Sequence, residues 1–332
     1  MMQWLKQKKL PLPLFLKSSV MNEELLRRSI LQTLTYFDLA NFPLTKEELF
    51  VFLWQPPSIS YEAFLVYLQK SSSTTSGFES AGGYFFLSGR KEIIEKRQRS
   101  LVISEKKLKI ACRAARLIRS VPFLKAVFVC NTVASEQAEK DSDIDFFIIA
   151  ASNRIWITRL LITFILQIFG LRRTKTSIKD KICLSFYITE DNLDLSGLRA
   201  VDDDIHFIFW LNQMVPIFDP QQYHARFLQA NSWVEKYIPH INFFNTSSYI
   251  FHVAETVWGA AWKTMWEKMW QGNYGTLVNT EAKKIQLSKM KFSGNSIDRK
   301  GGTNVVISDS VLKFHEKDTR LEYRALWQRK IN

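Results

Sequence analysis

Cysteine, glycine and proline are scarce in this chain, whose 332 residues include 3 Cys, 12 Gly and 9 Pro. The small glycine and proline content excludes a collagen-like or low-complexity chain. The cysteines Cys112, Cys130 and Cys183 are scattered and show no CxxC spacing. We therefore expect neither a disulfide framework nor a zinc-binding motif, and a reducing compartment is favoured.

A hydrophobic run long enough to span a membrane is also lacking. The strongest candidate, residues 155–171, is slightly short for a bilayer and contains Arg159 and Gln167. Asn153 before it and Gly170 near its end are typical caps of a buried helix in a globular protein. We expect a cytoplasmic protein with no membrane span.

The N-terminal segment lacks the features of a cleaved signal peptide. Residues 1–21 are basic, their short apolar stretch holds Pro11 and Pro13, and no small-residue cleavage site follows. We expect a basic, partly disordered arm.

Apolar and basic residues, in contrast, are abundant. Hydrophobic residues make up 46% of the chain and aromatic residues 14%, which is enough to offset chain entropy in a folded protein. The 45 Lys and Arg residues outnumber the 32 Asp and Glu, giving a net charge of +13. A basic surface attracts nucleic acid, nucleotide phosphates or anionic lipid, so the position of the charge matters.

The first hundred residues predict three helices followed by a small β-ribbon. Helical spacing covers residues 22–36, and Thr45 with Glu48 forms a capping box that opens a second helix ending near Trp54. A third helix fits residues 61–69, and residues 84–87 form a short strand. This order predicts a winged-helix-like domain over residues 22–100. An ordinary helical bundle with one hairpin is the alternative.

Residues 101–220 predict an α+β domain with a mixed sheet and flanking helices. A basic helix is expected within residues 90–119, either as a solvated face or as a phosphate-facing surface. Apolar runs predict strands over residues 124–130, 144–150 and 181–188, with a helix over residues 154–169 between the last two.

Residues 221–332 predict a helical C-terminal domain. A polar, glycine-bearing stretch near residues 289–308 is interpreted as a mobile loop, and a final helix is expected over residues 310–328. Four tryptophans spaced four residues apart predict one core-facing helix side, namely Trp258, Trp262, Trp266 and Trp270.

Asp143 and Asp145 are the residues that point most directly to chemistry. They flank Ile144 at the start of the predicted strand IDFFII, so their side chains should project to the same side. Two close carboxylates repel each other, and the usual compensation is a divalent cation beside substrate phosphates. We expect a metal site there.

The segment around these aspartates resembles the signature of the DNA polymerase beta-like nucleotidyltransferase superfamily. That signature is a strand, a Gly-Ser turn opening a short helix, and Asp-x-Asp leading the next strand; here Asn131 and Thr132 stand at the turn, and Asp143 and Asp145 form the Asp-x-Asp. The resemblance covers roughly residues 101–195. The chain is also similar to bacterial predicted nucleotidyltransferases that carry a winged-helix-like N-terminal region and a helical C-terminal region.

The resemblance implies that Asp143 and Asp145 are catalytic and hold Mg²⁺ (or Mn²⁺), which bridges the triphosphate of an NTP. Asn131 and Thr132 would contact a phosphate at the turn. The reaction would transfer a nucleoside monophosphate to an acceptor hydroxyl and release pyrophosphate. The acceptor is a small molecule, a protein or an RNA end.

A basic run precedes the third strand, and phosphate recognition or a solvated loop are its two interpretations. Lys181 is the candidate that we assign to nucleotide binding. The run consists of Arg172, Arg173, Lys175, Lys179 and Lys181.

Two departures from the family pattern leave open whether the chain is an enzyme. Asn131 replaces the turn glycine, and the third strand carries no acid where a third carboxylate is expected. The strand face there is expected to show Cys183, Ser185 and Tyr187, and Asp180, Glu190 or Asp191 could substitute only in another register.

An active nucleotidyltransferase is therefore the first hypothesis. A catalytically degenerate binding or regulatory protein of the same fold is the second. The third is a winged-helix regulator that binds nucleic acid through its basic surface, although the predicted second and third helices are poor in Arg.

Overall fold

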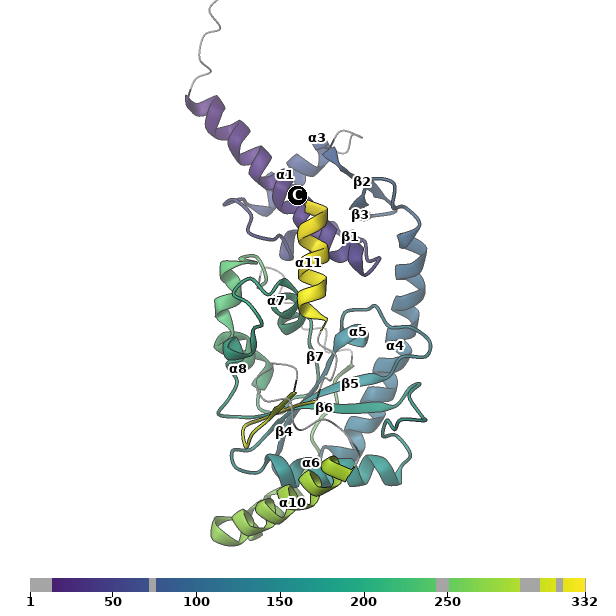
Figure 1. The fold of residues 1–332 in the computed structure, drawn as a ribbon, viewed down its shortest axis with the longest axis vertical. Coiled ribbons are helices and arrows are strands. Elements are labelled where there is room, and N and C mark those ends of the chain that lie inside the picture. The colour runs from purple at the N-terminus through teal and green to yellow at the C-terminus, as the bar shows by residue number, and fades with distance from the viewer. Residues whose placement is uncertain (1–13, 72–75, 243–250, 293–304, 315–318, 332) are drawn as a thin grey trace, which may run out of the picture.

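The computed structural model describes residues 14–71, 76–242, 251–292, 305–314 and 319–331. Two β-sheets are arranged along the long axis of the molecule, with the smaller sheet nearer the end where α1 lies (Figure 1). Helices pack around both sheets, so the described chain is a mixed α/β structure, as the sequence predicts at that level.

The small sheet belongs to the N-terminal unit, which we define as residues 14–71 and 76–87. Helix α1 begins at Leu14 rather than Asn22, so the last part of the expected arm is helical, whereas residues 1–13 lie outside the described residues. Strand β3 lies between β1 and β2 and is antiparallel to both. The elements in chain order are α1 (Leu14–Leu39), β1 (Leu44–Thr45), α2 (Lys46–Val51), α3 (Tyr61–Ser71), β2 (Phe78–Ala81) and β3 (Tyr84–Leu87).

Helix α2 begins with the predicted capping box. Glu48 N donates to Thr45 Oγ1 over 3.2 Å, and Thr45 N donates to Glu48 Oε2 over 2.8 Å. The helix ends at Val51, earlier than the predicted end near Trp54. The reason is tertiary, because the Trp54 amide donates to Thr33 Oγ1 of α1 over 2.9 Å instead of continuing the helix.

The large sheet has the strand order β7-β4-β5-β6-β9-β8. Strands β5 and β6 are parallel, whereas the other neighbouring strands are antiparallel, so the expected mixed sheet is confirmed. The predicted bounds of β4 and β5 are confirmed as well. The strands are β4 (Leu124–Cys130), β5 (Ile144–Ala150), β6 (Ile182–Thr189), β7 (Val215–Phe218), β8 (Val305–Ile307) and β9 (Val311–Phe314).

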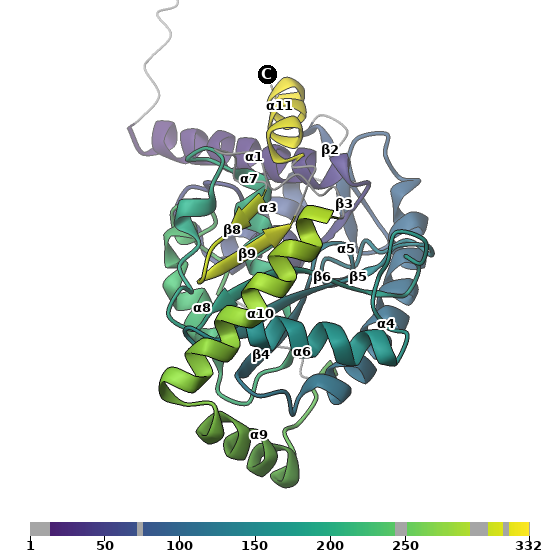
Figure 2. The same cartoon turned by 60° about the horizontal axis from the view of Figure 1, so that its bottom comes forward.

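Both faces of this sheet are buried because side chains alternate along its apolar strands. On β5, Phe146 belongs to the buried cluster on one face that includes Ile162 of α6, and Phe147 packs against Phe227 of α8 on the other face, with ring centroids 5.5 Å apart. Figure 2 shows α6 and α10 lying across one face. The helices are α4 (Ile93–Ile118), α5 (Asn131–Ala134), α6 (Ile155–Ile168), α7 (Ile205–Asn212), α8 (Tyr223–Ala230), α9 (Val257–Met269), α10 (Gly272–Phe292) and α11 (Arg320–Ile331).

The C-terminal region is not purely helical, which corrects the sequence-based expectation. Strand β9 pairs with β6, so this region extends the central sheet. The expected loop at 289–308 overlaps α10 and β8, and residues 293–304 lie outside the described residues. The final helix expected from residue 310 is preceded by β9 and begins at Arg320.

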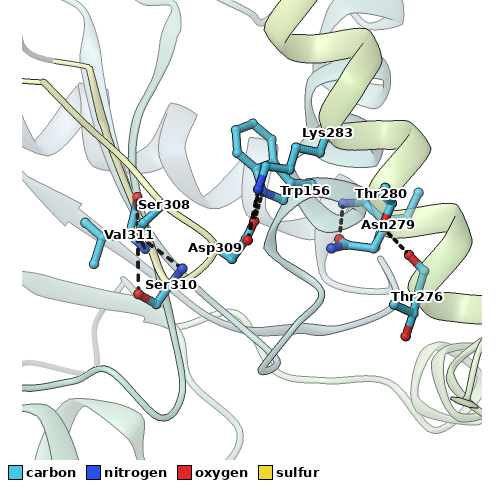
Figure 3. Close-up of polar contacts among 10 residues, drawn as sticks. Trp156, Thr276, Asn279, Thr280, Lys283, Ser308, Asp309, Ser310 and Val311 are labelled. Atoms are coloured by element: carbon cyan, nitrogen blue, oxygen red, sulfur yellow. Dashed lines mark hydrogen bonds and ion pairs between the residues drawn. The ribbon is translucent and has the colours of Figure 1, made fainter. Parts of the chain in front are cut away.

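The turn between β8 and β9 is tied to the helical layer (Figure 3). Asp309 Oδ1 accepts from Trp156 Nε1 of α6 over 2.8 Å, and Lys283 Nζ of α10 lies 2.7 Å from the same oxygen. Asn279 Oδ1 of α10 accepts from the Ile157 amide over 3.1 Å. These bonds fix the hairpin that brings β9 beside β6.

Helix α11 lies against both α1 and α7. Arg320 forms a buried ion pair with Asp204, the N-cap residue of α7, with Nη1 2.9 Å from Oδ2. Trp327 Nε1 donates to the Gln32 carbonyl of α1 over 2.8 Å. The end of the described chain is thereby joined to the N-terminal unit.

The tryptophan stripe of α9 does not form the core that its spacing predicts. Trp258 is 87% exposed and Trp262 is 52% exposed. Trp270 stacks on Phe123, with ring centroids 6.3 Å apart. Helical spacing shows that the rings share a side, but it does not show whether another element covers that side.

Helix α6 is buried on one side only, which corrects the expectation of a buried helix: Trp156 is fully buried, whereas Phe164 and Ile168 are each 63% exposed. Arg159 Nη1 donates to Gln286 Oε1 of α10 over 2.6 Å, and its guanidinium lies 4.7 Å from the Phe314 ring centre. Across the described ranges, no helix combines the length and apolar character needed to cross a bilayer.

Candidate functional site

Asp143 and Asp145 converge with Cys183 at one end of the central strands. Asp145 on β5 lies in register with Cys130 on β4 and with Cys183 on β6. One ligand atom from each of Asp143, Asp145 and Cys183 lies within 4.8 Å of the other two. The two aspartate side chains therefore share one region, with the Cys183 thiol as the third potential metal ligand.

An extra residue in β6 decides which side chains reach this cluster. Asp145 pairs with Cys183 and Phe147 pairs with Phe186, so β6 has one residue more than β5 over this interval. Cys183 and Phe186 consequently share the site face, whereas Tyr187 packs in the core on the other face. The expectation that Tyr187 shares the face of Cys183 is wrong.

The acids proposed as substitutes for a third carboxylate are engaged elsewhere. Asp180 Oδ1 accepts from Lys107 Nζ over 2.6 Å. The amide of Glu190 donates to the Ala150 carbonyl at the far end of β5, and Asp191 follows Glu190. In the described ranges, Cys183 completes the cluster in place of an acid.

A buried lysine holds the two loops that lead into β5 and β6. Lys107 on α4 is 1% exposed, and its Nζ donates to the Ser142 carbonyl over 2.7 Å as well as to Asp180. The Ile144 amide in turn donates to the Lys181 carbonyl over 2.9 Å. The basic character of α4 thus includes a structural role at the base of the site.

Burial and repulsion shape the charge of the aspartate pair. Burial raises the pKa of Asp145 to about 6, and the charge of Asp143 adds to this increase, whereas hydrogen bonds with Asn131 and Cys183 and the charge of Arg173 oppose it. Burial, reinforced by Asp145, also raises the pKa of the Cys183 thiol to about 12. Without a metal ion, Asp145 and Cys183 therefore tend to hold their protons, and a bound cation would stabilise their ionised forms.

Arg173 supplies positive charge to this cluster. Its Nη1 lies 2.9 Å from Asp143 Oδ2 as an ion pair that lacks hydrogen-bond alignment. The same Nη1 lies 3.5 Å from Cys183 Sγ. One guanidinium nitrogen thus faces two of the three potential ligand atoms.

Asn131 stands at the turn between β4 and β5 and has a left-handed backbone conformation. Its φ is 57°, which Asn tolerates better than most residues. Its Oδ1 accepts from Trp210 Nε1 of α7 over 2.7 Å, and its side chain also hydrogen-bonds to Asp145. Asn131 therefore positions Asp145, while the neighbouring Thr132 side chain lines the cavity described next.

A cavity of about 430 Å³ opens over the two aspartates. This volume falls within the range of roughly 300–1,000 Å³ common for small-molecule sites. Aromatic side chains from α1, α7, β6 and α11 form part of the wall, and Lys313 of β9 and Arg320 of α11 add positive charge. The lining includes Tyr36, Asn131, Thr132, Asp143, Asp145, Phe186, His206, Phe207, Trp210, Lys313, Arg320 and Tyr323.

The structure brings together most of the residues that the sequence singles out. Asn131, Thr132, Asp143 and Asp145 line the cavity. Lys181 is not among the lining residues, and its Nζ donates to the Gly170 carbonyl over 2.6 Å.

Sequence reasoning missed the walls of the cavity. Trp210, Lys313 and Arg320 come from separate regions of the chain, and no local motif marks them. The β-branched run Val305–Ile307, followed by Val311 and Leu312 just before Lys313, was the local signal that strands were present.

Comparison with known proteins gives no relative from which a role could be transferred. The chain matches no family model, no curated protein and no solved structure.

Proposed function

We propose that this protein is a nucleotidyltransferase that moves a nucleoside monophosphate from a metal–NTP complex to an acceptor hydroxyl and releases pyrophosphate. The observation that carries the proposal is the convergence of Asp143 and Asp145 at the floor of a cavity with aromatic and cationic walls. Such a cavity offers oxygen ligands for a cation, counter-charge for phosphates and flat surfaces for a base.

The order of elements supports this proposal. Strand β4, the short helix α5 and strand β5 are followed by α6 and by β6, which is parallel to β5. The same succession carries the Asp-x-Asp signature in the superfamily that the sequence resembles. The Asp-x-Asp here stands at the equivalent point, the start of β5.

The aspartates are suited to hold a divalent cation. Their ligand atoms converge, and the charge of Asp143 is balanced by a cationic group, Arg173, whose Nη1 lies 2.9 Å from Oδ2. Mg²⁺ or Mn²⁺ is the ion that the family resemblance implies, and when bound it would neutralise the triphosphate and orient it for attack. The Thr132 hydroxyl and Lys313 line the cavity and are placed to bind phosphate oxygens, whereas the Arg320 charge is paired with Asp204.

The aromatic wall is suited to a nucleobase. Trp210 and Phe186 stack with ring centroids 5.5 Å apart and an interplanar angle of 14°, and both line the cavity. Tyr36 and Tyr323 contribute further ring surface from α1 and α11. Aromatic side chains that line a site bind bases with little preference among them, so we expect several NTPs to bind.

We propose a winged-helix-like domain for the N-terminal unit, because its strand order β1-β3-β2 and its helix–strand–helix–helix–strand–strand succession follow that pattern. Helix α3, at the position of a recognition helix, exposes Glu62 and the 49%-exposed Val66 rather than a row of basic residues. Tyr36 at the end of α1 lines the cavity instead. These observations favour a structural role in the site over DNA reading.

Two observations favour a second candidate, a protein that binds a metal–nucleotide without transferring it. Cys183 stands where a third carboxylate is expected, and Arg173 already pairs with Asp143. A protein of this kind would bind NTP but release no pyrophosphate.

Calorimetry with each NTP and Mg²⁺ tests the nucleotide site. We expect binding to the wild type and its loss in the double variant Asp143→Asn/Asp145→Asn. Asp141→Asn is the matched control, because Asp141 lies on the same loop with its side chain 84% exposed and is not among the residues that line the cavity. Undiminished binding by a folded double variant would overturn both candidates.

Pyrophosphate release separates the two candidates from each other. The wild type is incubated with NTP, Mg²⁺ or Mn²⁺ and pooled acceptors that present sugar, protein and RNA hydroxyls. Release that depends on Asp143 and Asp145 supports transfer, whereas nucleotide binding without release under these conditions favours the binding protein.

A further inference from the structure

We propose that Cys183 is a metal ligand, and that Asp143, Asp145 and Cys183 together bind a zinc-class ion such as Zn²⁺ or Co²⁺ in preference to Mg²⁺. This inference deepens the proposed function, since it concerns the same carboxylates. It changes the expected cation, adds Cys183 as a ligand, and departs from the expectation, based on cysteine spacing, that the chain has no zinc site.

The geometry provides the first argument. One atom from each of the three side chains lies within 4.8 Å of the others. Asp145 is at the start of β5, Asp143 directly precedes that strand, and Cys183 is on the neighbouring strand β6. Main-chain bonds fix both segments, including the Ile144 amide to the Lys181 carbonyl at 2.9 Å. The ligand atoms are therefore held by the sheet rather than by a flexible loop.

A second and independent argument comes from Arg173. Its Nη1 lies 2.9 Å from Asp143 Oδ2 and 3.5 Å from Cys183 Sγ. A positive group thus already contacts a carboxylate and a sulfur together, which shows that the two atoms face a common point. Zn²⁺ binds sulfur at about 2.3 Å, so an ion would lie closer to both atoms than Nη1 does, and the 43%-exposed Arg173 side chain must turn outward to admit it.

The chemistry of the donor set indicates the kind of ion. Two carboxylate oxygens and one sulfur suit Zn²⁺ and Co²⁺, whereas Mg²⁺ strongly prefers oxygen alone. Three protein ligands leave a fourth position open in a tetrahedral site. Because Asp143 and Asp145 line the cavity, the open position is available to a phosphate oxygen or a water.

Binding requires the thiol to lose its proton. The S–H bond breaks, a sulfur–metal bond forms, and the proton passes to the solvent buffer. Protons released per bound ion can therefore be measured by calorimetry in buffers of different ionisation enthalpy. Their number should fall by about one when Cys183 is replaced by Ser.

Titration with Co²⁺ alone tests the proposal on the full chain. We expect a near-ultraviolet thiolate-to-cobalt charge-transfer band in the wild type and no such band in Cys183→Ser. Co²⁺ affinity should fall by about tenfold or more, since removing even an outer partner of a metal ligand has an effect of that size. Cys112→Ser is the matched control, because Cys112 is also buried but its Sγ contacts the Phe251 carbonyl at 3.4 Å.

The outcomes separate this inference from the proposed function. Absence of the band in the wild type, or its persistence in folded Cys183→Ser, would overturn the inference while leaving Mg²⁺–NTP binding intact. A Cys183-dependent band in a protein that binds no NTP would support the metal site and contradict the nucleotidyltransferase. If Cys183→Ser does not fold by circular dichroism, Cys183→Ala serves as the second variant.

Discussion

The indole Nε1 of Trp210 donates a hydrogen bond of 2.7 Å to Oδ1 of Asn131. This bond joins α7 to the turn between β4 and β5 and orients an amide that also hydrogen-bonds to Asp145. The asparagine at the turn is therefore an integral part of the site, and its replacement should affect both the backbone and the neighbouring carboxylate.

Substitution of Asn131 tests the backbone contribution. Asn131→Gly and Asn131→Ala both lose the side-chain bonds, but only Ala is strained at φ 57°. We expect Asn131→Ala to be less stable than Asn131→Gly by about 1–2 kcal/mol in urea denaturation. Equal stability of the two variants would show that the left-handed conformation costs nothing here.

The pH dependence of metal binding should follow Asp145. Its pKa is raised to about 6 by burial and by the charge of Asp143, and a cation requires the ionised carboxylate. Affinity should therefore fall about tenfold for each pH unit below 6. The measurement is Mn²⁺ titration of the Cys183→Ser variant, which has no thiol proton to lose, between pH 5 and pH 7, roughly spanning that value. A flat profile would contradict the assignment.

The same raised pKa predicts the sign of a stability effect in the metal-free protein. A carboxyl whose pKa is higher in the folded state stabilises the fold when protonated, and this stabilisation is lost as pH rises through about 6. Asp145→Asn should remove that part of the pH dependence. The check is to measure the denaturant midpoints of the wild type and of Asp145→Asn at pH values below and above about 6. The same pH dependence in both proteins would contradict the prediction.

Removal of the Arg173 charge should strengthen cation binding. The guanidinium contacts Asp143 and Cys183 and repels a metal ion near them. Since the side chain is partly exposed, we expect only about a two- to fivefold gain in metal affinity for Arg173→Ala. Arg172→Ala is the control, because Arg172 Nη1 instead donates to Gln167; an equal gain there would indicate a general charge effect.

Arg97 should be critical for stability. It is 4% exposed and forms ion pairs with Glu48 at 2.6 Å and Glu136 at 3.3 Å, which links α4, the capping box of α2 and the segment after α5. Arg97→Met removes the charged hydrogen bonds to Glu48, but both acids are partly exposed, so it should lower the free energy of unfolding by about 1–3 kcal/mol. Arg99→Met, at a 70%-exposed position of the same helix, should change it little.

Local sequence patterns were sufficient for the parts of the fold that depend on neighbours in the chain. Continuous apolar runs bounded by polar residues predicted β4 and β5, and alternation around Ile144 predicted that Asp143 and Asp145 would converge. The capping box at Thr45 was likewise a local feature.

Features that depend on distant partners were missed. The extra residue in β6 is defined only by pairing with β5. The sequence of β6 alone therefore could not show that Cys183 and Phe186 lie on the same face of the sheet. Similarly, Lys313 enters the cavity because β9 pairs with β6. No residue pattern near Lys313 predicts that β9 pairs with β6.

The position of α11 has a consequence for synthesis on the ribosome. The aspartates and the turn are made before β9 and α11, which supply Lys313, Arg320 and Tyr323 to the cavity wall. A nascent chain can form the central strands while this wall is still within the exit tunnel. Ligand affinity should therefore arise only after α11 has left the tunnel, and a bound ligand would stabilise only chains in which α11 has already docked.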